Sequence, residues 1–66
     1  MLEQVLEYFG QGYAVYVRDS YGGYQCDDEE EIRYAWPDED DSFHRVESVK
    51  VYELLHEVYF FVSDDE

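Results

Sequence analysis

Carboxylates dominate the side chains of this 66-residue chain that are capable of chemistry. Five acids follow one another at 27–31, and a second run of four occupies 38–41. Carboxylate oxygens suit hard cations, but a calcium loop alternates its ligands with spacers and needs a central glycine, which neither run has. Adjacent side chains of an extended chain also point to opposite faces, so these acids would not converge on one ion. We therefore expect no specific metal site and no cofactor.

Nucleophiles and bases are few. Cys26 and Ser48 are candidate nucleophiles, and His44 and His56 are candidate bases. Catalysis needs such groups in mutual contact within a concave site, and a chain this short has little room for a pocket. One cysteine and two histidines also provide neither a disulfide nor a typical structural zinc site. We expect a protein that is not an enzyme and has no catalytic residues.

The charge of the chain points to its class of partner. There are 18 acids against four Lys and Arg residues, which gives a formal net charge of -14. Such a surface repels nucleic acid and anionic membranes, whose binding proteins carry basic patches. We expect a basic partner: a nucleic-acid-binding protein, a basic peptide or a multivalent cation.

The spacing of the acids suggests how a nucleic-acid-binding protein would be engaged. Phosphates of one DNA strand repeat about every 3.4 Å, and residues of an extended chain rise about 3.3 Å each. An extended acidic run at 27–31 would therefore present negative charge at roughly phosphate spacing. Tight binding also needs apolar anchors, and aromatic residues make up 20% of the sequence. Acidic runs with an excess of aromatic residues predict a DNA mimic; the candidate anchors are Tyr34, Trp36, Tyr52, Tyr59 and Phe60.

The elements that would position these residues follow from periodicity. Apolar residues at helical spacing predict a helix over 2–9, and alternating residues predict a hairpin of strands at 13–18 and 24–26. The acidic run is either a loop or the middle of a long edge strand that includes 32–36. Ser48 as N-cap and apolar spacing predict a helix over 49–57. The apolar run 58–62 predicts a central strand that is buried on both faces, or on one face with a dimer interface on the other.

Together these elements predict one α+β domain over 1–66, with a small antiparallel sheet and one or two helices packed on it. A chain of this size without disulfide or metal gains little stability from its own core, so we expect a homodimer. No apolar run approaches the roughly 20 residues that span a membrane. The first residues lack the basic region of a secretory signal. A lone cysteine is typical of a reducing cytosol.

Two segments carry a resemblance to a known family. The hairpin 13–22 with Tyr24, and the segment 48–56, resemble the small uracil-DNA glycosylase inhibitors of bacteriophages, which are similar in size, acidity and strand-strand-helix-strand order. The resemblance implies a homodimer in the cytoplasm of a bacterial host cell. It implies an apolar pocket between two helices that accepts a leucine which the enzyme otherwise wedges into DNA. It also implies carboxylates that contact the enzyme's DNA-binding groove.

Carried over by position, Tyr52 and His56 would line that pocket, and Asp27 or Asp28 would make the acidic contact. The chain departs from the family in its extra N-terminal helix and in a longer segment over 29–47. If that segment rebuilds the sheet edge, the contact would come from Glu29, Glu30 or Glu31. Two other functions fit the same charge pattern. One is a DNA mimic directed at another nucleic-acid enzyme, such as a CRISPR nuclease or a restriction enzyme; the other is an antitoxin-like regulatory subunit.

Overall fold

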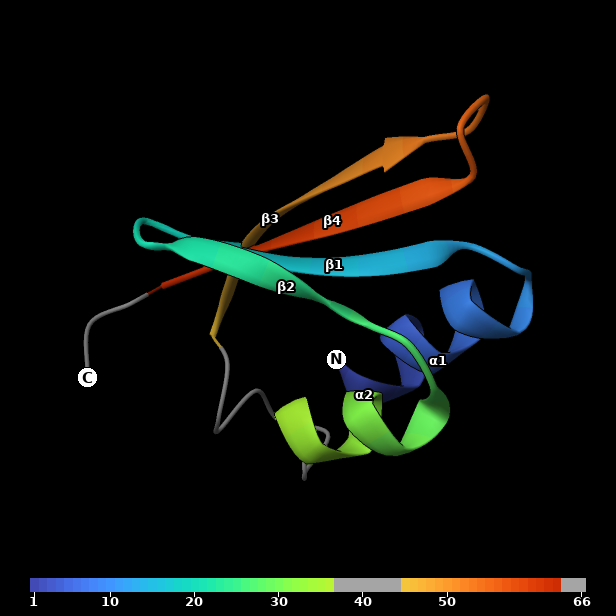
Figure 1. Ribbon diagram of the computed structural model, residues 1–66, viewed down its shortest axis with the longest axis horizontal. Helices are drawn as coiled ribbons and strands as arrows, with labels where there is room; N and C mark the ends of the chain where they lie inside the picture. Colours follow the sequence, from blue (N-terminus) through green and yellow to red (C-terminus); the bar gives the residue numbers. More distant parts are fainter. Residues whose placement is uncertain (37–44, 64–66) are drawn as a thin grey trace.

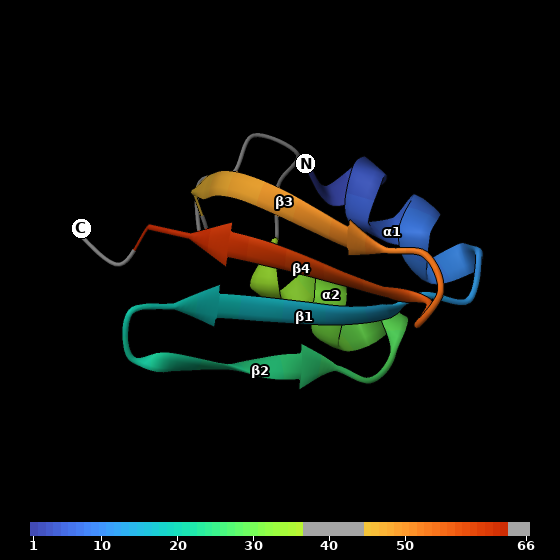
Figure 2. The same ribbon diagram turned by 90° about the horizontal axis from the view of Figure 1, so that it is seen from above.

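The computed structural model describes residues 1–36 and 45–63. The α+β class is confirmed: four strands form one sheet in the order β2-β1-β4-β3, and both helices lie on the same side of it (Figure 1). The other side of the sheet carries no helix of the described residues (Figure 2). The elements in chain order are α1 (Leu2–Gly10), β1 (Ala14–Asp19), β2 (Gly22–Cys26), α2 (Glu29–Ala35), β3 (Val46–Tyr52) and β4 (Glu57–Val62).

The sheet is mixed, not antiparallel as predicted. The hairpins β1–β2 and β3–β4 are antiparallel, but β1 pairs with β4 in parallel, with Tyr16 opposite Tyr59. A tight turn forces its two strands to run in opposite directions. The central pair β1 and β4 belongs to different hairpins, so the crossover through α2 sets its direction instead.

The N-terminal helix and the first hairpin are confirmed. In α1, Leu2 and Val5 are buried, and the chain leaves the helix through Gly12, whose φ of 92° favours glycine. The β1–β2 turn uses Gly22 at a φ of 133°. A side chain on Gly23 would collide with the carbonyl oxygen of Val17, so this position requires glycine.

The acidic run does not lie in a loop or a strand: most of it forms the first turn of α2. The Asp28 side chain caps the helix by accepting a hydrogen bond from the Glu31 amide at 2.9 Å. Carboxylates are favoured in a first turn because they face the positive end of the helix dipole. Ile32 and Ala35 are buried and Tyr34 is 79% exposed, which is the spacing of a helix and not the alternation expected of a strand.

The predicted helix over 49–57 is wrong, because this segment forms most of β3 and a four-residue turn. Val49 and Val51 are β-branched, and β3 pairs with β4 from Val46 to Tyr52 with a bulge near Ser48. The apolar spacing that predicted the helix does not mark a buried face. Leu54 is fully exposed and Leu55 is 67% exposed, in the turn itself.

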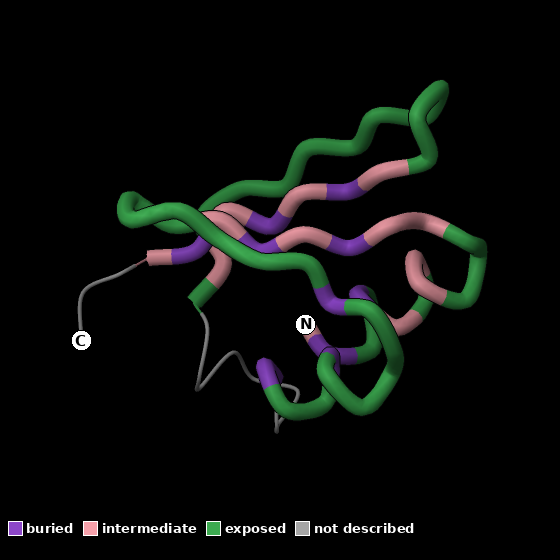
Figure 3. The backbone as a smooth tube through the Cα atoms, viewed as in Figure 1, coloured by how far each residue is buried: buried purple, intermediate pink, exposed green. Residues whose placement is uncertain are grey.

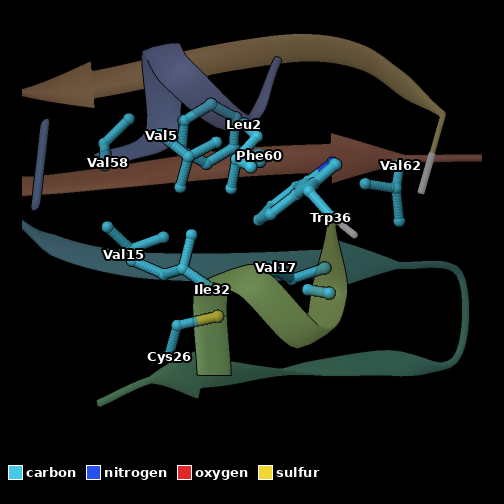
Figure 4. Close-up of a cluster of buried hydrophobic side chains, with 11 residues drawn as sticks. Leu2, Val5, Val15, Val17, Cys26, Ile32, Trp36, Val58, Phe60 and Val62 are labelled. Carbon is cyan, nitrogen blue, oxygen red and sulfur yellow. The ribbon is translucent and has the colours of Figure 1, made fainter. Parts of the chain in front are cut away.

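The core lies between the helices and one face of the sheet. β4 is central as predicted, but its burial alternates along the strand (Figure 3). The buried residues are Val58, Phe60 and Val62 (Figure 4). Trp36, directly after α2, packs edge-on against Phe60 with ring centroids 5.6 Å apart (Figure 4). The buried cluster is completed by Leu2, Val5, Val15, Val17, Cys26, Ile32 and Ala35.

No helix among residues 1–36 and 45–63 is long and apolar enough to cross a membrane. The second acidic run, at 38–41, and the acids at 64–66 lie outside the described residues.

Candidate functional site

The carboxylates at 27–31 surround the N-terminal end of α2, and all five residues are exposed. Two of them hold the chain in place. Asp28 caps the helix, and the Glu31 carboxylate accepts a hydrogen bond from the Asp27 amide at 2.7 Å. Glu29 forms an ion pair with Arg33 one turn later, at 2.9 Å. These contacts place a dense negative charge on a short, capped helix.

The helical conformation changes what this charge can imitate. A helix rises about 1.5 Å per residue and turns by about 100°, whereas an extended strand rises about 3.3 Å. Successive carboxylates therefore fan out around the helix end and do not follow a line at phosphate spacing. The charge density predicted from the sequence is present, but the predicted spacing is not.

Tyr52 lies at the end of β3 and is 43% exposed. Its ring stands perpendicular to that of Tyr59 on β4, with centroids 5.5 Å apart. Both rings belong to the side of the sheet that faces away from the helices. Tyr52 is therefore accessible to a partner, though from a strand and not from the expected helix.

His56 closes the β3–β4 turn, and its contacts are internal. Its ring stacks on Tyr13 at a centroid distance of 4.2 Å, and Nε2 lies 3.1 Å from the carbonyl oxygen of Gln11. Its own carbonyl oxygen accepts a hydrogen bond from the Ala14 amide at 2.9 Å. His56 thus joins the β3–β4 turn to the loop between α1 and β1, which is a structural role.

The structure does not bring the predicted site residues together. The acids at 27–31 follow β2 and the turn that contains His56 follows β3, and these strands form opposite edges of the sheet. Both strands end at the same end of the sheet, but β1 and β4 lie between them (Figure 2). Three strand spacings of about 4.8 Å amount to a separation of roughly 14 Å. Because Tyr52 and His56 are not helical, they form no pocket between two helices.

Sequence reasoning missed an aromatic surface on the uncovered side of the sheet. Tyr16 and Tyr59 stack there with centroids 4.7 Å apart, and the Arg18 guanidinium lies 5.8 Å and 5.5 Å from their ring centroids. Beside them is a hollow of about 230 Å³ lined by Arg18, Tyr52, Leu55, Glu57, Tyr59 and Phe61. In β1 the sequence alternates, which places Tyr16 and Arg18 on the other face of the strand from Val15 and Val17. In β4 the apolar run 58–62 is continuous, so the sequence does not show which of its residues face away from the core.

Among residues 1–36 and 45–63, charge is distributed unevenly over the two sides of the sheet. The two helices and the two residues before α2 carry seven exposed carboxylates: Glu3, Glu7, Asp27, Asp28, Glu29, Glu30 and Glu31. Strand register places Arg18, Lys50 and Glu57 on the aromatic side. The acidic and the aromatic surfaces are therefore distinct.

The candidate catalytic groups do not meet within the described residues. Cys26 is buried on the helical side, where burial and nearby carboxylates, first Glu31, raise the pKa of its thiol to about 11. Ser48 lies on the opposite edge of the sheet and on its other face. His44 falls outside the described residues. Among the residues that the structure describes, no three His, Cys, Asp or Glu side chains converge on a point that could hold a metal ion.

Comparison with known proteins finds no matching family model, and no curated protein or solved structure that matches significantly.

Proposed function

We propose that this chain is a non-catalytic, acidic binding protein that occupies the nucleic-acid-binding surface of a basic partner protein. The observation that carries the proposal is the gathering of seven exposed carboxylates on the two helices and directly before α2, five of them at 27–31. A surface of one sign attracts a groove of the opposite sign from a distance and accelerates association, with a strong dependence on salt.

The mimicry rests on charge density. The carboxylates of Glu29 and Glu30 lie in the first turn of α2, on a backbone fixed by the contacts of Asp28 and Glu31. A fixed array of negative groups loses less conformational entropy on binding than a disordered acidic tail would. A cationic groove shaped for phosphates would meet this array as a compact negative surface.

Uracil-DNA glycosylase is the first partner to test, because segments 13–22 and 48–56 resemble its phage inhibitors. The experiment measures the rate of uracil excision from a DNA duplex while the protein is added. The proposal expects the rate to fall to near zero at one equivalent in low salt, and to recover as salt is raised. An unchanged rate at a large molar excess would rule out this enzyme as the partner.

The same surface would serve another nucleic-acid enzyme equally well, since charge alone does not select among cationic grooves. Competition between the protein and labelled DNA for a CRISPR nuclease or a restriction enzyme extends the test. If the protein displaces DNA from none of these enzymes at low salt, nucleic-acid mimicry is wrong.

A further inference from the structure

The uncovered face of the sheet is a continuous surface whose members follow from strand register. Paired residues on neighbouring strands share a face, and Val15, Val17, Val58 and Phe60 point toward the helices. The opposite face therefore presents Ala14, Tyr16, Arg18, Gly23, Gln25, Ser48, Lys50, Tyr52, Glu57, Tyr59 and Phe61. Its centre is the stacked pair Tyr16 and Tyr59, both half-buried. We call this surface the aromatic face.

The charges of the aromatic face are nearly balanced in a molecule that is otherwise strongly acidic. Arg18, Lys50 and Glu57 give it a small positive excess, whereas the formal charge of the chain is -14. Two copies that met through their helical sides would bring carboxylates against carboxylates. Two copies that meet through their aromatic faces keep the helical carboxylates on the outside, far apart and solvated.

We propose that the aromatic face pairs with the same face of a second copy of this chain, as a two-fold symmetric dimer. A two-fold axis that crosses the strands at Tyr16 and Tyr59 reverses the strand direction, so these rings meet their own counterparts. Register places Arg18 opposite Phe61 at one end of the face, and Ala14 opposite Glu57 at the other. The axis exchanges these ends. It places Arg18 of each copy over Ala14 of the other copy. Glu57 of that other copy lies on the neighbouring strand, paired with Ala14.

The two ends of the face are complementary under this axis, as a two-fold interface requires. Lys50, which is paired with Tyr59 and so lies on the axis, faces Lys50 of the other copy at the edge strand β3. The small side chain of Ala14 leaves space above it for an arginine. Glu57 accepts a hydrogen bond from the Tyr59 hydroxyl at 3.1 Å, and it retains acceptor capacity for a guanidinium. Each dimer therefore contains two equivalent Arg18–Glu57 pairs on either side of a cluster of tyrosine rings.

The size of the face sets the strength of the dimer. Four strands about 4.8 Å apart, each about five residues long at about 3.3 Å per residue, give roughly 300 Å² of flat area per copy. The two copies together give roughly 600 Å², about half of the roughly 1,200 Å² at which standard specific interfaces begin, so the dimer is a weak one. We therefore expect a dimer that dissociates at micromolar concentrations, and a folded monomer below them.

Sedimentation velocity of the full chain over a range of concentrations tests the proposal, with a charge swap as the decisive comparison. Arg18→Glu and Glu57→Arg should each raise the dimer dissociation constant by about tenfold or more, because each places like charges together. The double variant R18E/E57R should restore the wild-type constant. If the net charge of the copies alone governed their association, Glu57→Arg would tighten the dimer, because it lowers the net negative charge.

Arg33→Glu on α2 is the matched control for Arg18→Glu, because it makes the same change of charge on the helical side. It should leave the dissociation constant within about twofold of wild type, once salt screens distant charges. Far-ultraviolet circular dichroism verifies that every variant is folded. A wild-type chain that stays monomeric at millimolar concentration would overturn the proposal, as would a double variant no better than the single ones. The proposal does not depend on the proposed function, because its test uses this chain alone.

Discussion

His56 has a left-handed backbone conformation, with a φ of 58°, in the turn between β3 and β4. A residue other than glycine in this region is strained by about 1 kcal/mol, although histidine is found there more often than most. Its ring contacts with Tyr13 and Gln11 offset that strain. The residue therefore combines an unfavourable backbone with a favourable side chain.

This balance predicts an order of stabilities for two variants. His56→Ala keeps the strain and loses the ring stacking, so it should destabilise the fold by about 1–2 kcal/mol. His56→Gly also loses the stacking but relieves the strain, so it should be more stable than the alanine variant. Urea denaturation followed by the fluorescence of Trp36, which is buried, measures both. An alanine variant at least as stable as the glycine variant would show that the backbone carries no strain.

Cys26 gives the protein a dependence on alkaline pH. Burial raises the pKa of the folded thiol from its ordinary 9.0 to about 11. Between these values the unfolded chain loses the thiol proton and the folded chain keeps it, so deprotonation favours unfolding. The contribution of Cys26 to stability is complete below pH 9 and is lost as the pH rises to about 11.

We therefore expect the stability of the wild-type protein to fall between pH 9 and pH 11 more steeply than that of Cys26→Ala. The comparison cancels the titration of the other groups, because both proteins share them. Denaturant titrations at several pH values provide the measurement. The same burial should protect the native thiol from aromatic disulfide reagents until denaturant is added. Rapid modification of the native protein would contradict the buried position of Cys26.

At the scale of elements, the cap of α2 is the contact that favours a helix in the segment for which a strand was predicted. Asp28→Ala removes the acceptor for the Glu31 amide and should cost about 1 kcal/mol, whereas Asp28→Asn retains an acceptor and should cost much less. Urea denaturation of the three proteins gives the difference. Equal stabilities of wild type and Asp28→Ala would mean that α2 is not capped in this way.

The elements that the sequence predicts well are those whose residues all favour one structure. Leu2 and Val5 begin a helical stripe that is confirmed in α1, and β1 alternates between the buried Val15 and Val17 and half-buried neighbours. Gly22 and Gly23 favour a turn between the two predicted strands. Local propensity and tertiary packing agree in these segments.

The elements predicted wrongly are those whose residue pattern fits both a helix and a strand. Ile32, Tyr34 and Trp36 alternate like a strand, while Ile32 and Ala35 share a helix face, and the packing of Trp36 on Phe60 is a long-range contact. In β3, helical apolar spacing competed with β-branched Val49 and Val51, and pairing with β4 decided the outcome. The aromatic face exists only because β1 and β4 are neighbours in the sheet, and no local sequence pattern predicts that pairing.

On the scale of the whole molecule, the charge of -14 has opposite effects on folding and on binding. Like charges on the helical side repel one another in the folded state, so salt should stabilise the free protein by screening them. The complex with a basic partner depends on attraction, so salt should weaken it. Thermal unfolding and binding measured over the same salt series should therefore change in opposite directions. A free protein that salt destabilises would contradict the repulsion.

The most direct test of the proposed function is the affinity for uracil-DNA glycosylase of two variants with equal net charge. Glu29→Gln/Glu30→Gln removes two carboxylates from α2, and Glu3→Gln/Glu7→Gln removes two from α1. We predict a stoichiometric complex of the wild-type protein at low salt. The α2 variant should bind the enzyme about threefold to tenfold more weakly than the wild-type protein, since each exposed ion pair contributes up to about 1 kcal/mol. The α1 variant should lose less affinity for the enzyme. Absence of any complex at low salt, or equal loss in both variants, would contradict a binding surface at the start of α2.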